Sequence, residues 1–182
     1  MSNLLKIYNE KVAPTLKEEF KLKNDFALPK IIKVVINVGA AEAITSKDVL
    51  EKIKEQVAII AGQRPRVTLA KKSISTFKLK EKDPIGVMVT LRGKKAWDFL
   101  EKFGSVVAPR IRDFRGMPDD KFDNVGNYSF GMTEQSLFPQ LEYSKIDKTR
   151  GMVITIVIRN GDKDKSKRLL ELLGLPFKKQ NG

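Results

Sequence analysis

A run of basic residues between Arg64 and Lys95 is the feature of this chain with the clearest chemistry. Ten of its thirty-two residues are Lys or Arg and only Glu81 and Asp83 are acidic, so it carries +8 of the net charge of +13. Charge concentrated in this way favours a polyanionic partner, because the counterions displaced from phosphates add to the affinity. Charge that only aids solubility is expected to be spread more evenly. The run therefore indicates nucleic-acid binding.

Cysteine and histidine are absent from the chain, which narrows the chemistry that it can perform. Their absence excludes disulfides, zinc clusters, thiolate nucleophiles, imidazole bases and haem ligation. Carboxylates remain, but the acidic pairs Glu18–Glu19 and Asp119–Asp120 are neighbours in sequence and do not form a convergent catalytic pair. We therefore expect a protein that is not an enzyme, with no cofactor and no metal site.

Two motifs resemble ligand-binding loops but do not fit them. The segment GNYSFGMT at 126–133 has the glycine spacing of a phosphate loop, yet Met132 stands where the lysine is required. Its Tyr128 and Phe130 are expected to anchor the surrounding segment. The segment NGDKDK places Asp162 and Asp164 as in a metal loop, but intervening lysines and the lack of a downstream glutamate favour helix capping.

Two predicted strands can position a binding surface beside the basic run. At 30–39 and 85–92, aliphatic residues alternate with a partly polar set, and alternate residues of a strand lie on opposite faces. Helices packed on the aliphatic face leave the other face open, because covering it would bury polar groups. This open face carries Lys33, Asn37, Thr90 and Arg92. Asn37 and Thr90 can hydrogen-bond to ribose hydroxyls or base edges, while Lys33 and Arg92 can hold phosphates. The alternative is an ordinary sheet face exposed to solvent, which has the same pattern of residues.

Helices are predicted at 4–20, 45–62, 94–107 and about 164–174 from apolar residues at helical spacing. Within the first, Pro14 kinks the helix or restarts it as a first-turn residue. The second is predicted to begin at a capping box formed by Thr45 and Asp48 and to end at Gly62. The aliphatic run at 152–159 predicts a third strand.

Strands joined by separate helices and long loops are typical of an α+β fold. We expect a mostly antiparallel sheet with helices packed on one face, an open RNA-binding face and a protruding basic loop. The chain is expected to form one domain, 1–182, with the basic loop at 71–83 and a loop-rich excursion at 110–150 that holds one short helix before Pro139. Neither a membrane span nor a secretory signal is recognisable, so a cytoplasmic protein is expected.

The basic loop interleaves apolar residues with its lysines. The segment AKKSISTFKLKEKD contains five lysines, which are expected to contact phosphates, together with Ile74, Phe77 and Leu79. Phe77 can stack on a base or pin the loop to the core. Packing is the favoured interpretation for this side chain alone, because aromatic rings bury readily.

Arg110, Arg112 and Arg115 form a second basic cluster at the start of the excursion. In an extended chain Arg110 and Arg112 share a side. The cluster can touch RNA or an acidic protein surface. It can equally pair with the nearby aspartates Asp113, Asp119 or Asp120.

Six motifs taken together resemble one known family. The chain contains, in family order, KVVINVG, GQRPRVTLAKKSISTFKL, IGVMVTLRG, PRIRDFRG, GNYSFG and RGMVITIV. These motifs resemble those of the bacterial large-subunit ribosomal proteins that bind 5S rRNA, number five in the usual nomenclature, and span essentially the whole chain. The resemblance implies an α+β protein that binds 5S rRNA and helps attach it to the large subunit in the central protuberance. It also implies contacts with large-subunit rRNA, with the P-site tRNA, with neighbouring ribosomal proteins and, across a moving bridge, with a small-subunit protein.

The resemblance further implies roles for particular residues. Asn37, Gln63 and Thr90 would form the polar 5S rRNA-binding face, with Arg92 nearby. Strand alternation adds Lys33 to the residues expected on this face. The basic loop would reach toward the tRNA elbow. Its expected contacts to tRNA or rRNA are Lys71, Lys72, Ser73, Phe77, Lys78, Lys80 and Lys82. The excursion would lie toward the intersubunit bridge, with Arg110, Arg112 and Arg115 at the bridge or on rRNA. The segments GVMVT and KEKD depart from the family pattern, which leaves individual tRNA contacts open.

Two other function classes remain to be separated from a structural ribosomal protein. A general RNA-binding or ribosome-assembly protein would leave the large subunit in a high-salt wash, whereas a permanent constituent would sediment with it. A phosphotransfer enzyme or nuclease would need a convergent acidic cluster, which the sequence does not suggest. Metal-dependent turnover of RNA by the purified protein would favour that third class.

Overall fold

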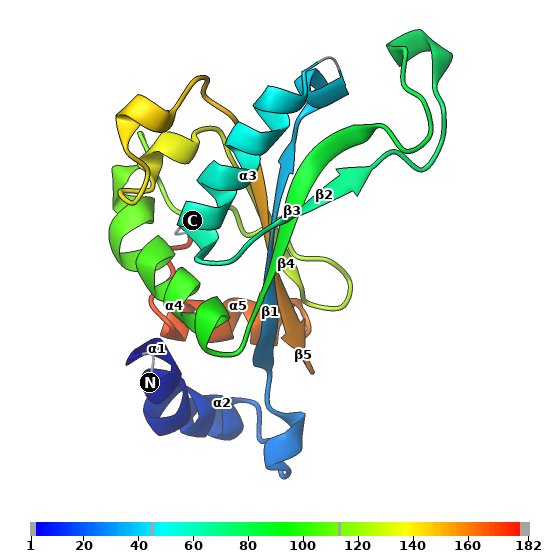
Figure 1. Ribbon diagram of the computed structural model, residues 1–182. Helices are drawn as coiled ribbons and strands as arrows, with labels where there is room; N and C mark the ends of the chain where they lie inside the picture. The colour runs from blue at the N-terminus through cyan, green and yellow to red at the C-terminus, as the bar shows by residue number, and fades with distance from the viewer. Residues whose placement is uncertain (1–2, 45, 113, 179–182) are drawn as a thin grey trace. The chain divides into compact units, whose positions relative to one another are not determined.

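A computed structural model describes residues 3–44, 46–112 and 114–178. Its strands are β1 (Lys30–Gly39), β2 (Arg66–Leu69), β3 (Pro84–Arg92), β4 (Tyr128–Met132) and β5 (Met152–Arg159). Its α-helices are α1 (Asn3–Ile7), α2 (Ala13–Glu19), α3 (Lys47–Ala61), α4 (Lys94–Lys102) and α5 (Lys163–Leu172). The strands form one sheet in the order β2-β3-β1-β5-β4, with β2 antiparallel to β3 (Figure 1). The prediction of an α+β fold with an antiparallel sheet is confirmed.

The chain divides into two compact units. Unit 1 comprises Met1–Val34, Arg92–Phe130 and Thr155–Gly182, and unit 2 comprises Val35–Leu91 and Gly131–Ile154. Both units have buried apolar residues of their own. None of the described helices is both long and apolar enough to cross a membrane.

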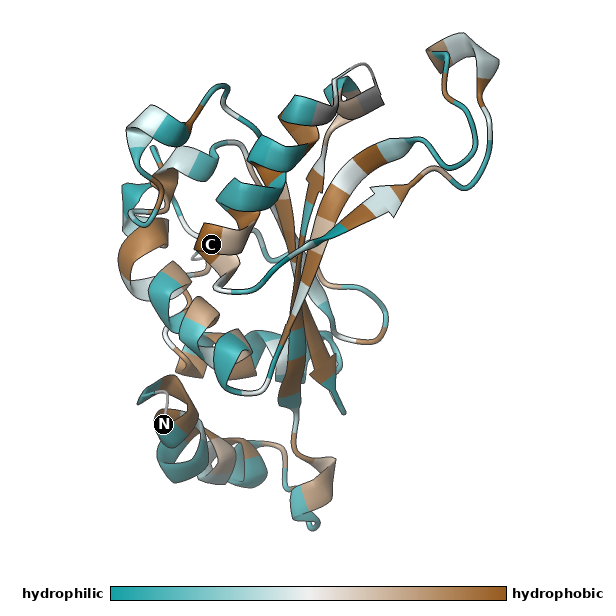
Figure 2. Cartoon of the chain, viewed as in Figure 1, coloured by the Kyte–Doolittle hydropathy of each residue, from teal (hydrophilic) through white to brown (hydrophobic). Residues whose placement is uncertain are grey.

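The core of unit 2 forms where α3 packs on the sheet. Buried residues recur along one side of α3, and apolar and polar residues separate onto opposite sides of this helix in Figure 2. Ile53 and Val57 of α3 surround the same small internal space as Val38 of β1 and Met152 of β5. Within unit 2 the alternating aliphatic residues of both strands are buried, as the pattern predicts: Ile36 and Val38 of β1, and Val87, Val89 and Leu91 of β3.

The two ends of α3 can be compared with the helix boundaries predicted from the sequence. The helix ends at Gly62, which has a φ of 62°, a left-handed conformation that glycine adopts without steric cost and that the sequence predicts. The N-cap of α3 is Ser46, and its side chain makes no capping hydrogen bond. The predicted N-cap Thr45 lies outside the described residues.

The N-terminal helices of unit 1 pack through one apolar stripe. Helix α1 continues through a π-helical turn (Tyr8–Val12) into α2, and Pro14 lies in the first turn of α2, where its missing N–H costs nothing. Tyr8 and Leu16 are buried, and the ring of Tyr8 packs on Trp97 of α4 with centroids 5.4 Å apart. Pro14 is thus a first-turn residue of α2, as one of the two predicted outcomes has it, while the helical backbone continues unbroken from α1.

Strand β4 lies inside the segment 110–150, for which the sequence predicts loops. Tyr128 is fully buried, and its ring lies 4.7 Å from that of Phe122 and 5.5 Å from that of Phe177. The predicted anchoring role of Tyr128 is thus confirmed, but the strand that positions it was missed. Its five residues include Gly131 and follow a turn at Gly126, so the local sequence has the character of a loop.

Candidate nucleic-acid interface

Unit 2 exposes one face of its strands, here called the polar face, which comprises Asn37, Arg66, Thr68, Met88 and Thr90. Asn37, Met88 and Thr90 alternate with buried residues, so their side chains point away from α3. Arg66 and Thr68 pair with Met88 and Gly86, which places them on the same side. Asn37 and Arg66 are exposed and the other three are partly exposed. The described elements of unit 2 therefore leave this side of the sheet accessible.

Gln63 joins the polar face through a hydrogen bond. Its Nε2 donates to the backbone oxygen of Thr90 at 3.1 Å, across 27 residues of sequence. The left-handed Gly62 turns the chain out of α3 immediately before Gln63, which lets the amide reach β3. Gln63 and Thr90, which are both predicted to bind 5S rRNA, are therefore in direct contact.

The strand pairing fixes where Asn37 lies on the polar face. The backbone N–H of Ala40 donates to the oxygen of Ile85 at 2.9 Å, so the end of β1 lies beside the start of β3. Continuing this antiparallel pairing places Asn37 opposite Met88, whose partner on the other side is Arg66 of β2. An amide, a thioether and a guanidinium thus form a row across three strands. The alternation of Val67 and Leu69 predicts a strand here, but it does not place Arg66 and Thr68 on the polar face, because that depends on the pairing of β2 with β3.

Gly86 allows the strands of the polar face to approach closely. A Cβ atom at this position would lie 2.6 Å from the backbone oxygen of Val38 and 3.0 Å from Oγ1 of Thr68. The first distance is below any normal contact with backbone. Glycine is therefore required here for β1 and β2 to flank β3 at this spacing.

The two cations predicted beside this face, Lys33 and Arg92, belong to unit 1. Lys33 is partly exposed on β1 and Arg92 is exposed at the end of β3. Neither makes an ion pair with a described residue. Each is thus available to a phosphate, on the same strands that carry Asn37 and Thr90.

Residues 71–83, here called the basic arm, extend beyond the ends of β2 and β3 (Figure 1). Backbone bonds tie the base of the arm: the N–H of Ala70 donates to Asp83 at 2.8 Å and that of Lys82 donates to Ala70 at 2.9 Å. Nearer the tip, Ile74 and Leu79 exchange two backbone bonds of 2.9 and 3.1 Å. Ser73 contributes its hydroxyl, which accepts from the N–H of Glu81 at 2.9 Å. The arm is therefore a defined hairpin-like element.

The lysines of the arm point into solvent. The exposed ones are Lys71, Lys72, Lys78, Lys80 and Lys82, and none of them makes an ion pair with a described residue. Phe77 lies in a short 3-10 turn (Ser75–Phe77) and is 72% exposed. The favoured prediction that Phe77 packs against the core is therefore wrong, because the turn that carries it projects beyond the strands.

A groove of about 750 Å³ joins the base of the arm to the polar face. Asn37 and Thr68 line it from the sheet, and Lys71, Lys72 and Ile74 line it from the arm. The first two lysines of the arm therefore share a surface with Asn37. The lysines nearer the tip do not line this groove.

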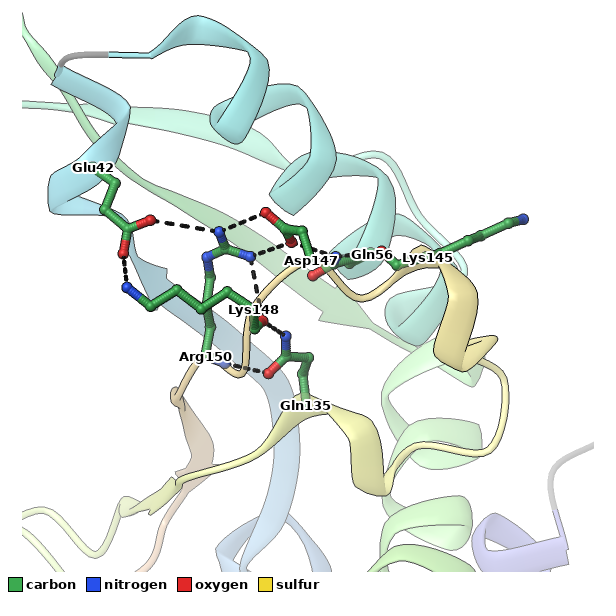
Figure 3. Close-up of polar contacts among 7 residues, drawn as sticks. All are labelled: Glu42, Gln56, Gln135, Lys145, Asp147, Lys148 and Arg150. Carbon is green, nitrogen blue, oxygen red and sulfur yellow. Dashed lines mark hydrogen bonds and ion pairs between the residues drawn. The ribbon is translucent and has the colours of Figure 1, made fainter.

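A polar network behind the sheet holds the segment after β4 in place (Figure 3). Arg150, whose side chain is only 9% exposed, donates to both carboxylate oxygens of Asp147 at 2.7 and 3.0 Å. Gln56 of α3 donates to the oxygen of Lys145 at 2.8 Å, and Gln135 donates to that of Lys148 at 2.6 Å. The network therefore fastens 145–150 to α3 from within unit 2.

The charges of this network stabilise one another. Hydrogen bonds from Arg150 hold the pKa of Asp147 far below its usual range, and the same bonds raise the pKa of Arg150. A hydrogen bond from Lys148 lowers the pKa of Glu42 in the same way. Because these cations are already paired, the network has a structural role and offers little to an RNA phosphate.

The arginine cluster of unit 1 makes no ion pair with Asp119 or Asp120, two of the three partners in the ion-pair alternative. Arg110, Arg112 and Arg115 are exposed, and none pairs with a described carboxylate. Asp119 pairs with Lys167 at 3.3 Å and Asp120 with Lys121 at 3.0 Å, while Asp113 lies outside the described residues. The described part of the chain also lacks any group of three acidic side chains that could hold a metal ion.

Comparison with known families gives two adjoining matches. Residues 24–80 match the family described as ribosomal protein L5, and residues 84–177 match the ribosomal L5P family C-terminus. The large ribosomal subunit protein uL5 of Symbiobacterium thermophilum is 49% identical over 177 residues, which covers 97% of this chain and 98% of the relative. That of Desulfatibacillum aliphaticivorans is 48% identical over 179 residues, covering 98% and 100%. The chain belongs to the ribosomal protein L5 family.

Membership of the L5 family tests the predictions of family, protein class and cellular location. The predicted family is confirmed, as is the expectation of a ribosomal protein and not an enzyme. The relatives are bacterial ribosomal proteins, which agrees with the predicted place in the cytoplasmic ribosome. Asn37 and Gln63 fall in the first family match and Thr90 and Arg92 in the second, so the polar face draws on both.

Proposed function

We propose that this L5-family protein is a structural constituent of the large ribosomal subunit that binds 5S rRNA with its polar face and helps attach it in the central protuberance. The relatives named as large-subunit proteins support the place in the subunit. The observation that carries the site is the bond from Gln63 Nε2 to Thr90 O. It joins residues from separate motifs on the accessible side of the sheet that also presents Asn37.

The polar face has the chemistry to recognise RNA by shape. The Asn37 amide and the Thr90 hydroxyl can each donate and accept, which suits ribose 2′-hydroxyls and base edges. Arg66 in the same row can hold a phosphate with two parallel hydrogen bonds. Because the strands fix the backbone that carries these groups, little backbone entropy is lost when RNA binds.

We further propose that the tip of the basic arm contacts the P-site tRNA, as the family resemblance implies. Its lysines are exposed and unpaired among the described residues, which suits contact with a phosphate backbone. The exposed arginines Arg110, Arg112 and Arg115 are proposed to contact rRNA or a small-subunit protein across the intersubunit bridge.

Alanine substitutions test the polar face. Asn37→Ala and Thr90→Ala should each weaken 5S rRNA binding by roughly 1–3 kcal/mol in a filter-binding titration, because each removes a hydrogen bond that is shielded in the complex. The Gln63 bond uses the backbone oxygen of Thr90, so the fold should survive. Thr149→Ala, an exposed threonine of unit 2 outside this face, is the matched control. Unchanged affinity in both test variants would show that 5S rRNA binds elsewhere.

A further inference from the structure

Unit 1 contains a hollow that takes no part in the proposed 5S rRNA site. It has a volume of about 590 Å³, within the usual range for small-ligand sites. The N-terminal helices, the loop before β1 and the end of β5 surround it, and its lining includes Tyr8, Pro14, Asp25, Phe26, Lys30 and Arg159. We refer to it as the N-terminal hollow.

Phe26 stands in solvent at the edge of the hollow although its backbone is held firmly. The residue is 83% exposed. Its N–H donates to Oδ1 of Asn24 at 2.9 Å, and its carbonyl accepts from Nδ2 of Asn160 at 2.5 Å. An exposed aromatic ring contributes no free energy of burial to folding. A ring on a fixed backbone can, however, stack on a binding partner at low entropic cost.

The hollow has an excess of positive charge. Its carboxylate, Asp25, pairs with Lys17 at 2.5 Å, so that pair is internally neutral. Lys30 and Arg159 are exposed and make no ion pair with a described residue. Burial raises the pKa of the Tyr8 hydroxyl, and the positive charge of nearby Arg159 partly offsets this. Two cations are therefore available to an anion in the hollow.

Stacking surface and free cations together favour one class of ligand. We propose that the N-terminal hollow holds an unpaired nucleotide of RNA, with its base on the Phe26 ring and its phosphate between Lys30 and Arg159. Every base has a face that can stack, so this contact tolerates different sequences. An acidic peptide would satisfy the cations but would leave the ring without a planar partner. The contact uses none of Asn37, Gln63 or Thr90, so it is separate from the proposed 5S rRNA site.

Photochemical crosslinking of the full-length protein tests the hollow. The probe is an oligouridine that contains 5-iodouridine, and the expected product is an adduct on the peptide that carries Phe26, located by mass spectrometry. Phe26→Ala should abolish this adduct, while Val125→Ala, which alters another exposed apolar residue of unit 1, should not. No adduct at Phe26, or an adduct that survives Phe26→Ala, would overturn the proposal.

Affinity is measured in a protein whose Lys78, Lys80 and Lys82 are changed to Gln, so that the arm does not dominate binding. In this background Phe26→Ala should weaken binding of the oligouridine by about five- to hundredfold. Arg159→Gln should lower the slope of log affinity against log salt by about 0.7, the value for one phosphate contact on a single strand. Lys102→Gln, an exposed lysine of α4, is the control for charge alone. If Arg159→Gln and Lys102→Gln lower this slope equally, the proposal that a phosphate binds in the N-terminal hollow is wrong.

A second experiment identifies the occupant in assembled subunits. A photoreactive phenylalanine analogue in place of Phe26 should crosslink to rRNA in purified large subunits. A crosslink to protein, or none, would overturn the proposal. On the isolated chain, Asn37→Ala should leave the Phe26 adduct with the oligouridine intact even where it weakens 5S rRNA binding. Loss of the adduct in that variant would show that the hollow is not an independent site.

Discussion

The polar face and the basic arm are adjacent parts of unit 2 that present RNA-binding groups in opposite ways. The face holds Thr90 and Gln63 partly buried and joined by a hydrogen bond. The arm leaves its lysines exposed and without ion pairs to described residues, and hydrogen bonds within it join backbone groups with one another and with the short side chains of Ser73 and Asp83. Fixed groups can match the shape of one RNA, whereas exposed lysines attract any phosphate. Shape and charge are therefore separate contributions here, and they can be removed separately.

The groove at the base of the arm modifies this comparison. Lys71 and Lys72 line it together with Asn37, so the first two lysines belong with the face. Lys78, Lys80 and Lys82 lie further along the arm and outside the groove lining. Salt should thus weaken RNA binding by the face as well, through these two lysines at its edge and Arg66 within it.

Among the changes that separate the face from the arm, Gly86→Ala is expected to have the largest effect on stability and on 5S rRNA binding. It alters the polar face and leaves the residues of the basic arm unchanged. The added Cβ would lie 2.6 Å from the Val38 backbone oxygen, so β1 or β3 must shift. We expect the free energy of unfolding to fall by about 1–3 kcal/mol and 5S rRNA binding to weaken with it. Urea denaturation and filter binding measure the two effects.

Gly131→Ala on β4 is the matched control for Gly86→Ala. A Cβ at Gly131 meets no atom within 4 Å, so its stability should change far less. Equal destabilisation by the two substitutions would mean that loss of glycine flexibility, and not the close approach of β1 to β3, sets the effect.

The part of the face that was predictable from sequence is the part with long, regular alternation. Asn37 and Thr90 lie in strands of ten and nine residues, where a period of two is plain. Arg66 and Thr68 lie in a four-residue strand, and their place on the face depends on pairing with β3. Such pairing is a tertiary property, so local pattern could not reveal it.

Residue type gives the wrong prediction for Phe77 and no prediction for Gln63. Phe77 was expected to be packed because aromatic rings usually bury, yet its turn projects from the strands. The bond from Gln63 to Thr90 spans 27 residues, and no spacing rule predicts it. Only the resemblance to the family placed Gln63 with the face. The position of a binding residue at the end of a helix or strand therefore depends on the adjoining turn. For Gln63 this turn is the left-handed Gly62 at the end of α3.

The next effect concerns the arm. Changing Lys78, Lys80 and Lys82 together to Gln should leave 5S rRNA binding unchanged and reduce retention of tRNA on assembled ribosomes about tenfold, because up to three phosphate contacts are lost. Retention of labelled tRNA at increasing salt measures it. The same change at Lys6, Lys11 and Lys102, which are exposed lysines of unit 1, controls for net charge. Collapse of 5S rRNA binding would show that face and arm act as one surface.

Acid should weaken the scaffold behind the face. Arg150 lowers the pKa of Asp147 in the folded state, so Asp147 contributes stability above about pH 4 that is lost as the pH falls through the folded pKa. Asp147→Asn should therefore cost about 1 kcal/mol at pH 7, after allowance for solvent screening, and little at pH 2. Urea denaturation at both pH values measures this. Glu55→Gln, an exposed carboxylate of α3, is the control, and an equal loss there would mean that general surface charge is responsible.

The smallest effect is expected from Phe77→Ala at the tip of the arm. Because the ring is 72% exposed, the free energy of unfolding should change by less than about 0.5 kcal/mol. The same substitution at fully buried Phe103 should cost about 3–5 kcal/mol, which calibrates the measurement. A loss above about 1 kcal/mol for Phe77→Ala would mean that the arm folds back and buries the ring in solution. The contrast between a fixed face and an exposed arm would then apply only to the RNA-bound protein, since the free arm would have packing of its own.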